Sequence, residues 1–328
     1  MLKPVDLEKV KDLASRYVSA HNTQPAKWFI KGKEFLLTDD ESRKLPFADP
    51  NSHDHLVSIG AALETMKIAL SGFGFGLKVL SQSLRPCVEI RCELVEVSET
   101  DPLFPFLENR RSVRNKFRKA NFSEKSALKS QFLNKANIKL VEDKKTITEV
   151  ANDFNRANYH FLGQKDYLAE LNEWLRFDRS DSSFTEDGLN PEAMYLSQVE
   201  AFGAKYVLKP SIFSILKKMG LAKTMIDEKS KVLSATAIAF LVVKEETDEI
   251  SRGSFFMRTW LEFTQIGFSL NPLSCLTDFT FYNEKWSKRL HLNSDEYLLN
   301  AFRVGPTPEK LASNFRLPKE KVFLEKEI

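Results

Sequence analysis

The sequence predicts an α+β fold, because some segments show helical spacing of apolar residues and others show strand patterns. Residues 7–20 and 55–72 carry apolar side chains every three to four positions, which is typical of helices that pack on a core. Residues 88–97 alternate, and residues 235–243 form a continuous apolar, partly β-branched run, which indicates a buried strand. At 328 residues, the chain can form one large domain or two of ordinary size.

The first part of the chain predicts a helix, a hairpin and a second helix. The helix over residues 7–20 stops at residues 22–25, where Asn, Thr, Gln and Pro favour a turn. Residues 28–30 and 35–37 flank a Lys-Gly-Lys turn and predict a short hairpin. The helix from His55 to about Gly72 ends where glycines recur at positions 72, 74 and 76.

A break at residues 100–105 separates these elements from the rest of the chain. Beyond it we expect helices at 123–132, across 146–177, over most of 191–225 with an interruption at Pro210, at about 253–266 and around Trp286. We expect strands at 138–141, 235–243 and 297–304.

Composition excludes several classes of protein. Lys plus Arg number 48 and Asp plus Glu 45, and this net charge of +3 is too small to indicate a polyanion binder. Three cysteines without a C-x-x-C pair support neither a disulfide framework nor a zinc site. The first residues lack a signal-peptide core, and the longest mostly apolar run, 232–243, is too short to span a bilayer. We therefore expect a cytoplasmic protein with no membrane contact.

Two expected helices share a glycine spacing. Gly60 and Gly74 lie 14 residues apart, as do Gly253 and Gly267, and a phenylalanine follows the second glycine of each pair. This echo suggests an internal duplication. The alternative is that glycines simply mark where helices begin and end.

Three short segments carry polar groups suited to binding. Residues 19–25 offer hydroxyl and amide groups at a helix end, and residues 109–119 are the densest basic stretch. Guanidinium groups with a hydroxyl between them, as at Arg110, Ser112 and Arg114, can donate paired hydrogen bonds to a phosphate. The third segment, residues 313–318, contains Arg316. The alternatives are a self-capping loop for the first segment, and a solvated basic face or a nucleic-acid patch for the second.

Other motifs give weaker signals. The glycines at 72–76 follow a helix, not a strand, and lack the Lys-Ser/Thr ending of a phosphate loop. The adjacent residues His53, Asp54 and His55 cannot all face one ion from a helix, so we expect no metal site. No hydrolase signature is present, and we name no catalytic residue. Such a chain can take its chemistry from a cofactor.

Together, the segments Arg110–Arg114, Ala20–Pro25 and Phe315–Pro318 resemble motifs of the nitroreductase family of FMN-dependent flavoproteins. The Asn-x-Gln-Pro segment comes first here, an order similar to that of the tandem-repeat (Acg-like) branch. The resemblance implies a nitroreductase-like fold whose two related halves, 1–103 and 104–328, form an intramolecular pseudo-dimer. A helical insertion around 199–231 would be lid-like.

The family's FMN lies between two subunits, so two halves in one chain need each motif only once, and the chain could be monomeric. The resemblance implies that the cofactor contacts are His21, Asn22, Gln24, Pro25, Arg110, Arg111, Ser112, Arg114, Asn271, Pro272, Leu273 and Arg316. Within this set, Arg110 and Arg316 would hold the phosphate, and Arg114 would approach the pyrimidine side of the flavin.

The chain departs from the family's motifs at three positions. Ala26 replaces a tryptophan, Asn314 stands where many relatives have lysine, and no acidic residue accompanies Pro272. The function implied is ping-pong hydride transfer from NADH or NADPH through FMN to an unknown small-molecule acceptor. The alternatives are a protein that only stores FMN, and a basic nucleic-acid-binding module.

Overall fold

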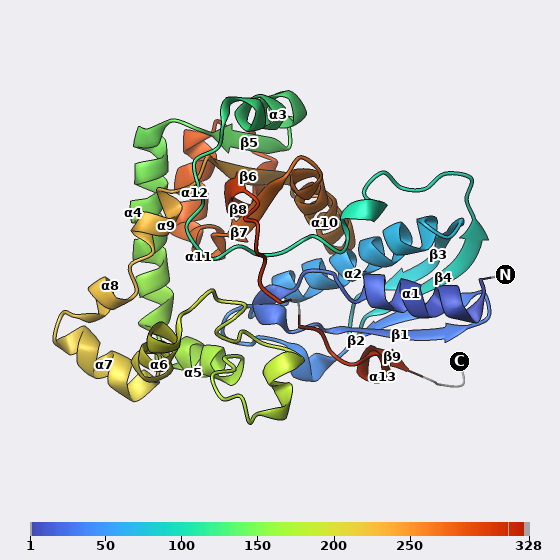
Figure 1. Cartoon of the computed structure of the whole chain (residues 1–328), viewed down its shortest axis with the longest axis horizontal. Coiled ribbons are helices and arrows are strands. Elements are labelled where there is room, and N and C mark those ends of the chain that lie inside the picture. The colour runs from blue at the N-terminus through green and yellow to red at the C-terminus, as the bar shows by residue number, and fades with distance from the viewer. Residues whose placement is uncertain (1, 314, 325–328) are drawn as a thin grey trace.

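The computed structural model describes residues 2–313 and 315–324 and confirms the α+β class. Two β-sheets lie side by side, each with a long helix, α2 or α10, against it (Figure 1). One sheet has the strand order β3-β4-β2-β1-β9, and the other has the order β5-β6-β8-β7. No helix among the described residues combines the length and the apolar character that crossing a membrane requires.

The first sheet belongs mainly to the N-terminal part of the chain. Its elements are α1 (Pro4–Ala14), β1 (Ala26–Lys31), β2 (Glu34–Asp39), α2 (His53–Ser71), β3 (Phe75–Ser83) and β4 (Glu89–Glu96). The expected hairpin, central helix and strand at 88–97 are confirmed. The first helix is shorter than predicted, because it ends at Ala14 and a separate 3₁₀ turn forms at Ala20–Asn22.

The second sheet is built from the C-terminal part. Its strands are β5 (Ile138–Val141), β6 (Ala237–Lys244), β7 (Phe268–Pro272) and β8 (Glu296–Pro306), and α10 (Glu249–Gln265) precedes β7. Around them lie α3 (Phe122–Phe132), α11 (Ser274–Asp278) and α12 (Thr280–Arg289). The strand expected at 235–243 is confirmed, and residues 237–243 are all buried.

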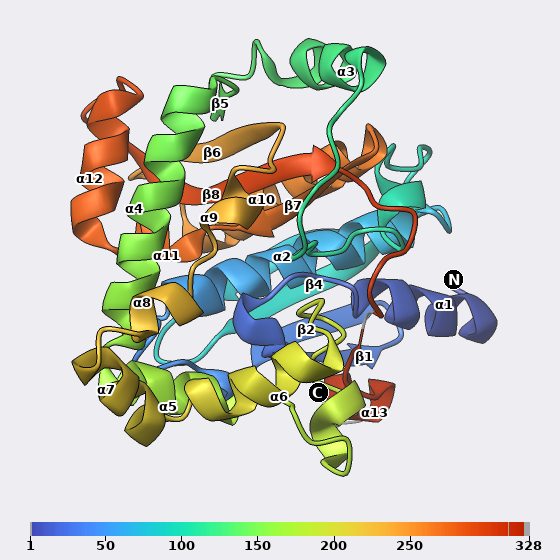
Figure 2. The ribbon, with the colours of Figure 1, turned by 60° about the vertical axis from the view of Figure 1, so that its left-hand side comes forward.

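A long helical segment separates β5 from β6. It contains α4 (Lys144–Leu162), α5 (Lys165–Glu173), α6 (Gln198–Val207), α7 (Pro210–Lys218), α8 (Ala222–Met225) and α9 (Lys229–Val232). In Figure 2, α4 runs down the left of the molecule, and α5, α6 and α7 lie along its lower edge. The expected interruption falls at Pro210, which begins α7. Most of 191–225 is helical, as predicted, but the first helix starts only at Gln198, since Tyr195 has a φ of 58°.

The sequence patterns do not predict three of the strands, because the signals of these strands are short or polar. β3 is largely solvent-exposed, so its residues do not alternate in hydrophobicity. β7 has five residues and ends at a proline, and β9 (Phe323–Leu324) has two. β9 pairs in parallel with β1, so the end of the chain returns to the first sheet.

The two sheets share one strand order. The order β3-β4-β2-β1 corresponds to β7-β8-β6-β5, and all these neighbours are antiparallel. In each sheet the long helix connects the third strand of that order to the first, with α2 between β2 and β3 and α10 between β6 and β7. The same arrangement of four strands and one helix therefore occurs twice in the chain.

The two long helices cross where each has a glycine. A Cβ on Gly60 would overlap the carbonyl oxygen of Ile250, and a Cβ on Gly253 would overlap that of Val57 and come 2.7 Å from the Cα of Gly60. Both glycines lie inside their helices, so they do not mark helix starts. Gly74 and Gly267 follow the helix ends with φ of 80° and 79°. The shared interval therefore runs from the crossing point to the helix end.

This crossing generates a stability prediction. Gly60→Ala and Gly253→Ala should each destabilise the protein by about 1–3 kcal/mol or more, because the new methyl group meets rigid backbone. The measurement is the midpoint of urea unfolding. Gly203→Ala in α6 is the matched control, because a Cβ there meets nothing within 4 Å. That change should stabilise by about 0.4–1 kcal/mol. Equal midpoints for all three variants would contradict the proposed tight crossing.

Candidate functional site

The basic segment 110–114 runs along the edge of the second sheet. Ser112 forms a parallel bridge with Leu270 of β7, and the Val113 N–H donates to the Leu270 carbonyl at 3.0 Å. From β8, the Arg303 guanidinium donates to the carbonyls of Val113, at 2.9 Å, and Asn115, at 2.8 Å. Arg303 is 1% exposed, and burial lowers its pKa to about 10. It therefore fixes the path of the basic segment.

The loop 19–25 has an unusual backbone. His21, Asn22 and Gln24 have φ of 47°, 57° and 53°, a region that costs non-glycine residues about 1–3 kcal/mol each. Gln24 holds the loop in place. Its Oε1 accepts the Leu317 N–H and its Nε2 donates to the Glu186 carbonyl, both at 2.9 Å. Strain of this kind persists only where neighbouring structure enforces it, which is common at binding sites.

Arg110 and Arg316 converge on the end of α1. Arg316 donates to the carbonyls of Ser15, at 2.7 Å, and Tyr17, at 3.1 Å, and Arg110 donates to that of Arg16 at 3.0 Å. Arg316 also donates to Asn22 Oδ1 at 2.9 Å. Ser15 is the C-cap of α1, and cations favour this end of a helix because its last carbonyls lack partners within the helix. Residues from the two ends of the chain thus meet here.

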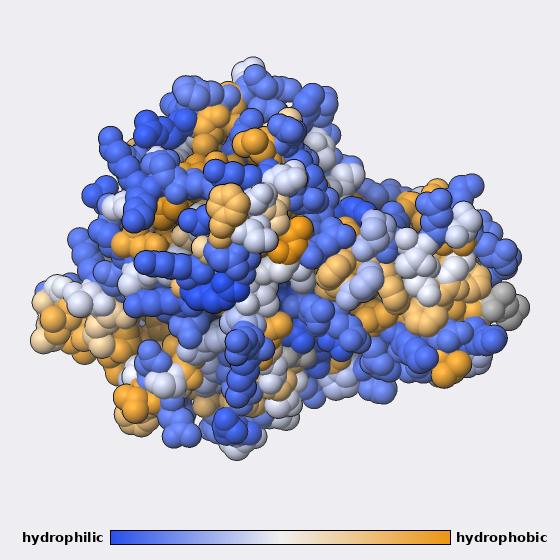
Figure 3. All heavy atoms as spheres, turned by 45° about the horizontal axis from the view of Figure 1, so that its top comes forward, coloured by the Kyte–Doolittle hydropathy of each residue, from blue (hydrophilic) through white to orange (hydrophobic). Residues whose placement is uncertain are grey.

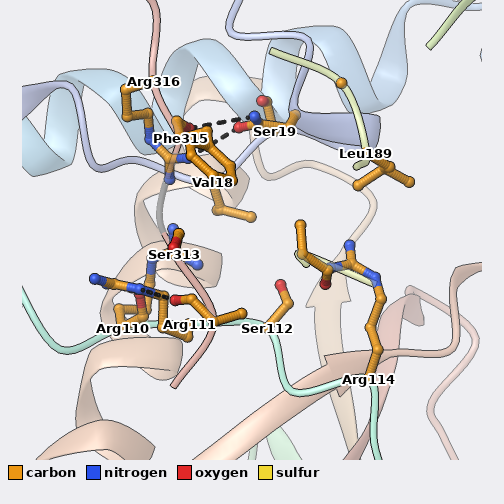
Figure 4. A pocket seen from close by; sticks show the side chains of 14 residues that line it. Val18, Ser19, Arg110, Arg111, Ser112, Arg114, Leu189, Ser313, Phe315 and Arg316 are labelled. Atoms are coloured by element: carbon orange, nitrogen blue, oxygen red, sulfur yellow. Dashed lines mark hydrogen bonds between the residues drawn. The ribbon is translucent and has the colours of Figure 1, made fainter. Parts of the chain in front are cut away.

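These segments enclose a cavity with an empty volume of about 570 Å³, which is open in part to solvent. Six of the predicted residues line it: Asn22, Arg110, Arg111, Ser112, Arg114 and Arg316. In Figure 4, Ser112 lies between Arg111 and Arg114, across the open space from Val18 and Leu189. Sequence reasoning missed Val18, Gly188, Leu189, Ala193 and Ala312 as lining residues. Ser313 and Phe315 also line the cavity, whereas Asn314 lies outside the described residues.

The cavity is strongly electropositive. None of the ion pairs formed by the described residues involves Arg110, Arg111, Arg114 or Arg316. Burial and the neighbouring arginines lower the pKa of Arg110 well below its usual value, and burial lowers that of Arg316 to about 9. The Nε of Arg110 is buried and has no hydrogen-bond partner among residues 2–313 and 315–324. Because buried charges normally have counter-ions, this donor set fits an anion such as a phosphate.

A second cavity of about 460 Å³ shares Val18 and Ser19 with the first. Its walls include Asp54 at the start of α2, Pro272 at the end of β7, and Asn300 on β8. Asn300 is 5% exposed, and no donor among the described residues reaches its Oδ1. Burial raises the pKa of Asp54 to about 6. The sequence shows no acid next to Pro272, but the fold places Asp54 in the same cavity.

The other predicted site residues lie outside the walls of both cavities. His21 and Pro25 belong to the strained loop, and the Gln24 side-chain amide forms hydrogen bonds with the Glu186 and Leu317 backbone. On the other side, Asn271 Nδ2 donates to the Pro272 carbonyl at 3.2 Å, and Leu273 is fully buried. Within the described residues, no group of three His, Cys, Asp or Glu side chains is placed to hold a metal ion. His55, considered above for a metal, instead contacts Asp39 at 2.8 Å.

Comparison with known proteins gives a partial match. No family model matches the chain. Over 93 residues, 28% of this chain, it is 32% identical to each of two curated Mycobacterium tuberculosis proteins that carry the provisional name NAD(P)H nitroreductase. The match spans 26% of the length of each relative. It indicates distant homology to NAD(P)H nitroreductases over that part of the chain.

Solved structures of FMN-dependent nitroreductases are also similar, at low identity. One from Sphigopyxis sp. strain HMH, described as FMN- and NADPH-dependent, has 13% identity and a TM-score of 0.36, covering 70% of this chain and 100% of that one. One from Mycobacterium smegmatis, in complex with NADPH, has 17% identity and a TM-score of 0.34, covering 65% and 91%. At these values the likeness supports no conclusion about the chemistry of this chain.

His21 generates a prediction of pH dependence. Burial, together with the nearby Arg114, lowers its pKa from 6.5 to about 4, so the folded protein keeps it neutral while the unfolded chain protonates. The contribution of His21 to the free energy of unfolding is fully present above pH 6.5. As the pH falls toward 4, this free energy decreases by about 3 kcal/mol in total.

The measurement compares His21→Asn with the unmodified protein, because Asn tolerates positive φ. The free energy of unfolding is determined by urea at several pH values between 7 and 4. As the pH falls, the free energy of unfolding of the unmodified protein should decrease relative to that of the variant, because the variant has no histidine to protonate at this position. Parallel pH profiles would show that His21 keeps its ordinary pKa.

Proposed function

We propose that the chain is an FMN-dependent oxidoreductase of the nitroreductase type, reduced by NADH or NADPH and acting on a small-molecule acceptor. The observation that carries this proposal is the set of four arginines around Ser112 without a carboxylate partner among the described residues. Distant homology to NAD(P)H nitroreductases supports the same chemistry.

The residues present fit the phosphate end of FMN. In the described part of the chain, the Nε–H of Arg110 has no acceptor, and Arg114 donates from Nη1 to the Ala193 carbonyl. Ser112 adds a hydroxyl at the wall of the cavity. Guanidinium groups bind phosphate oxygens with paired, charge-assisted hydrogen bonds. Arg316 makes most of its hydrogen bonds to Ser15, Tyr17, Asn22 and Phe315, so its main contribution is positive charge and the position of Asn22.

When bound, FMN would supply the redox chemistry, which is to accept hydride from the nicotinamide and pass it to the acceptor. The protein's residues would hold and orient it. Arg110, Arg111 and Ser112 would bind the phosphate, and Arg114 would stabilise negative charge further along the cavity. The apolar side chains of Val18, Leu189 and Phe315 exclude water from part of the wall. In the adjoining cavity, the Asp54 carboxyl can hold a proton near neutral pH.

The proposal includes two related halves, 1–103 and 104–328, that form an internal pseudo-dimer and allow the chain to work as a monomer. The repeated strand order and the crossing at Gly60 and Gly253 support it. So does β9, which the C-terminal half contributes to the first sheet. The cavity takes Asn22 from the first half and its arginines from the second, so one chain supplies both sides. NADH and NADPH as reductants are consistent with a cytoplasmic location.

The two alternatives have less support. A nucleic-acid module needs its basic residues on the surface. Lys116, Arg118 and Lys119 of this segment are exposed, but Arg110 at the cavity is only 3% exposed. A protein that only stores FMN was suggested by the lack of an acid beside Pro272, and Asp54 shares a cavity with Pro272. The tests below separate all three.

Replacing one arginine tests the cofactor site. Arg110→Met should weaken FMN binding by about 1.5–3 kcal/mol, or about 10- to 150-fold, because it removes a charge-assisted contact. The measurement is quenching of flavin fluorescence on titration with apo-protein. Arg118→Met is the matched control, because Arg118 belongs to the same basic segment but is exposed and paired with Glu124. Equal affinities for the two variants would remove Arg110 from the site.

Anaerobic mixing of the FMN-loaded protein with NADH or NADPH tests catalysis separately. We expect the flavin absorption band to bleach and to return when an electron acceptor such as a nitroaromatic compound is added. If FMN binds but its absorption band never bleaches, the protein only stores FMN. A chain that binds DNA or RNA with strong salt dependence, and binds no flavin, would establish the nucleic-acid alternative.

A further inference from the structure

The helices α6, α7 and α8 expose an unusual number of apolar side chains. We call residues 198–225 the α6–α8 segment. Seven of its large apolar side chains are between 41% and 82% exposed: Val199, Phe202, Tyr206, Ile215, Met219, Leu221 and Met225. Soluble proteins seldom expose so many in one short segment without a partner. Figure 3 shows hydrophobic residues gathered at the end of the molecule where α7 and α8 lie.

A different set of side chains anchors the segment to the protein. Phe213 of α7 and Ala222 of α8 are 2% and 1% exposed and pack with Leu162 and Leu168 in a small separate core. The exposed side chains are therefore not the ones that pack this segment onto the rest of the protein. The segment is apolar on both its inner and its outer sides, and a helix of that kind is normally covered on both.

The charges within the segment are nearly all positive. It contains five lysines, Lys205, Lys209, Lys217, Lys218 and Lys223, and one acidic residue, Glu200. None of the five lysines forms an ion pair with the described residues. The segment therefore combines apolar side chains with unpaired positive charge, and its complement is a surface that is both apolar and anionic.

Lysine content favours a lipid surface over a protein partner. Protein interfaces are depleted in lysine, whereas helices that lie in the headgroup region of a membrane carry lysine beside Phe, Leu and other apolar residues. With ten and nine residues, α6 and α7 are too short to cross a bilayer but long enough to lie on one. This differs from the expectation of no membrane contact, which considered only spanning segments.

We propose that the α6–α8 segment docks this protein on an anionic lipid surface, with its apolar side chains among the acyl chains and its lysines at the headgroups. No residue lining either cavity belongs to this segment, so a lid role finds no support in these contacts. The proposal does not depend on FMN binding.

Flotation of the full chain with lipid vesicles tests the proposal. The protein should float with vesicles of phosphatidylglycerol and phosphatidylcholine, float much less with phosphatidylcholine alone, and be released by salt. Each neutralised lysine should weaken binding about fivefold, so Lys209→Gln with Lys218→Gln should weaken it about 25-fold. The double variant Phe202→Ser with Met219→Ser should also bind less, because it removes inserted apolar area.

The controls lie on and beside α3, in another part of the molecule (Figure 1). Lys119→Gln with Lys125→Gln matches the charge change, and Phe122→Ser removes a side chain that is 89% exposed. Both should bind vesicles as the unmodified protein does. All substituted residues are exposed, and circular dichroism verifies folding.

Three results would overturn the proposal. The first is no flotation with either vesicle, and the second is equal loss in the test and control variants. The third is a dimer, detected by light scattering, that the Phe202→Ser and Met219→Ser variant dissociates, since a second copy would then cover the segment.

Discussion

The close crossing of α2 and α10 is the constraint on which the rest of the structure depends. With hydrogen in place of a side chain at Gly60 and Gly253, the two backbones come within 2.9 Å of where a Cβ would lie. Each helix packs against its own sheet, so the crossing sets how the two sheets face each other. Arg258 of α10 reinforces it by pairing with Glu64 of α2 at 2.8 Å and with Asp101 at 2.7 Å. The loop 19–25 and the basic segment meet as a result.

Bringing the loop 19–25 and the basic segment together has an electrostatic cost at the cavity. Burial removes hydration from several guanidinium groups around one cavity and lowers the pKa of Arg110, Arg114 and Arg316. Neighbouring arginines lower the pKa of Arg110 and Arg316 further. The helix-end carbonyls of Ser15, Arg16 and Tyr17 offset only part of this. A phosphate would provide the missing negative charge, so the protein's own stability should rise when an anionic ligand binds.

Sequence patterns predicted the elements that bury a regular apolar face, such as β6 and α2, because periodicity reports burial directly. They missed β3, β7 and β9, which are exposed or short. For the site, motifs pointed to Arg110, Ser112, Arg316 and their neighbours. They could not point to Arg303 or Asp54, whose roles depend on contacts between residues far apart in the chain.

The most direct measurement compares the affinities of FMN and riboflavin by isothermal titration calorimetry on the apo-protein. The two ligands share the ring and the ribityl chain and differ only in the phosphate. If the arginine cavity binds that phosphate through several charge-assisted contacts, FMN should bind at least about 100-fold more tightly. Equal affinities, or no binding of either ligand, would contradict the account.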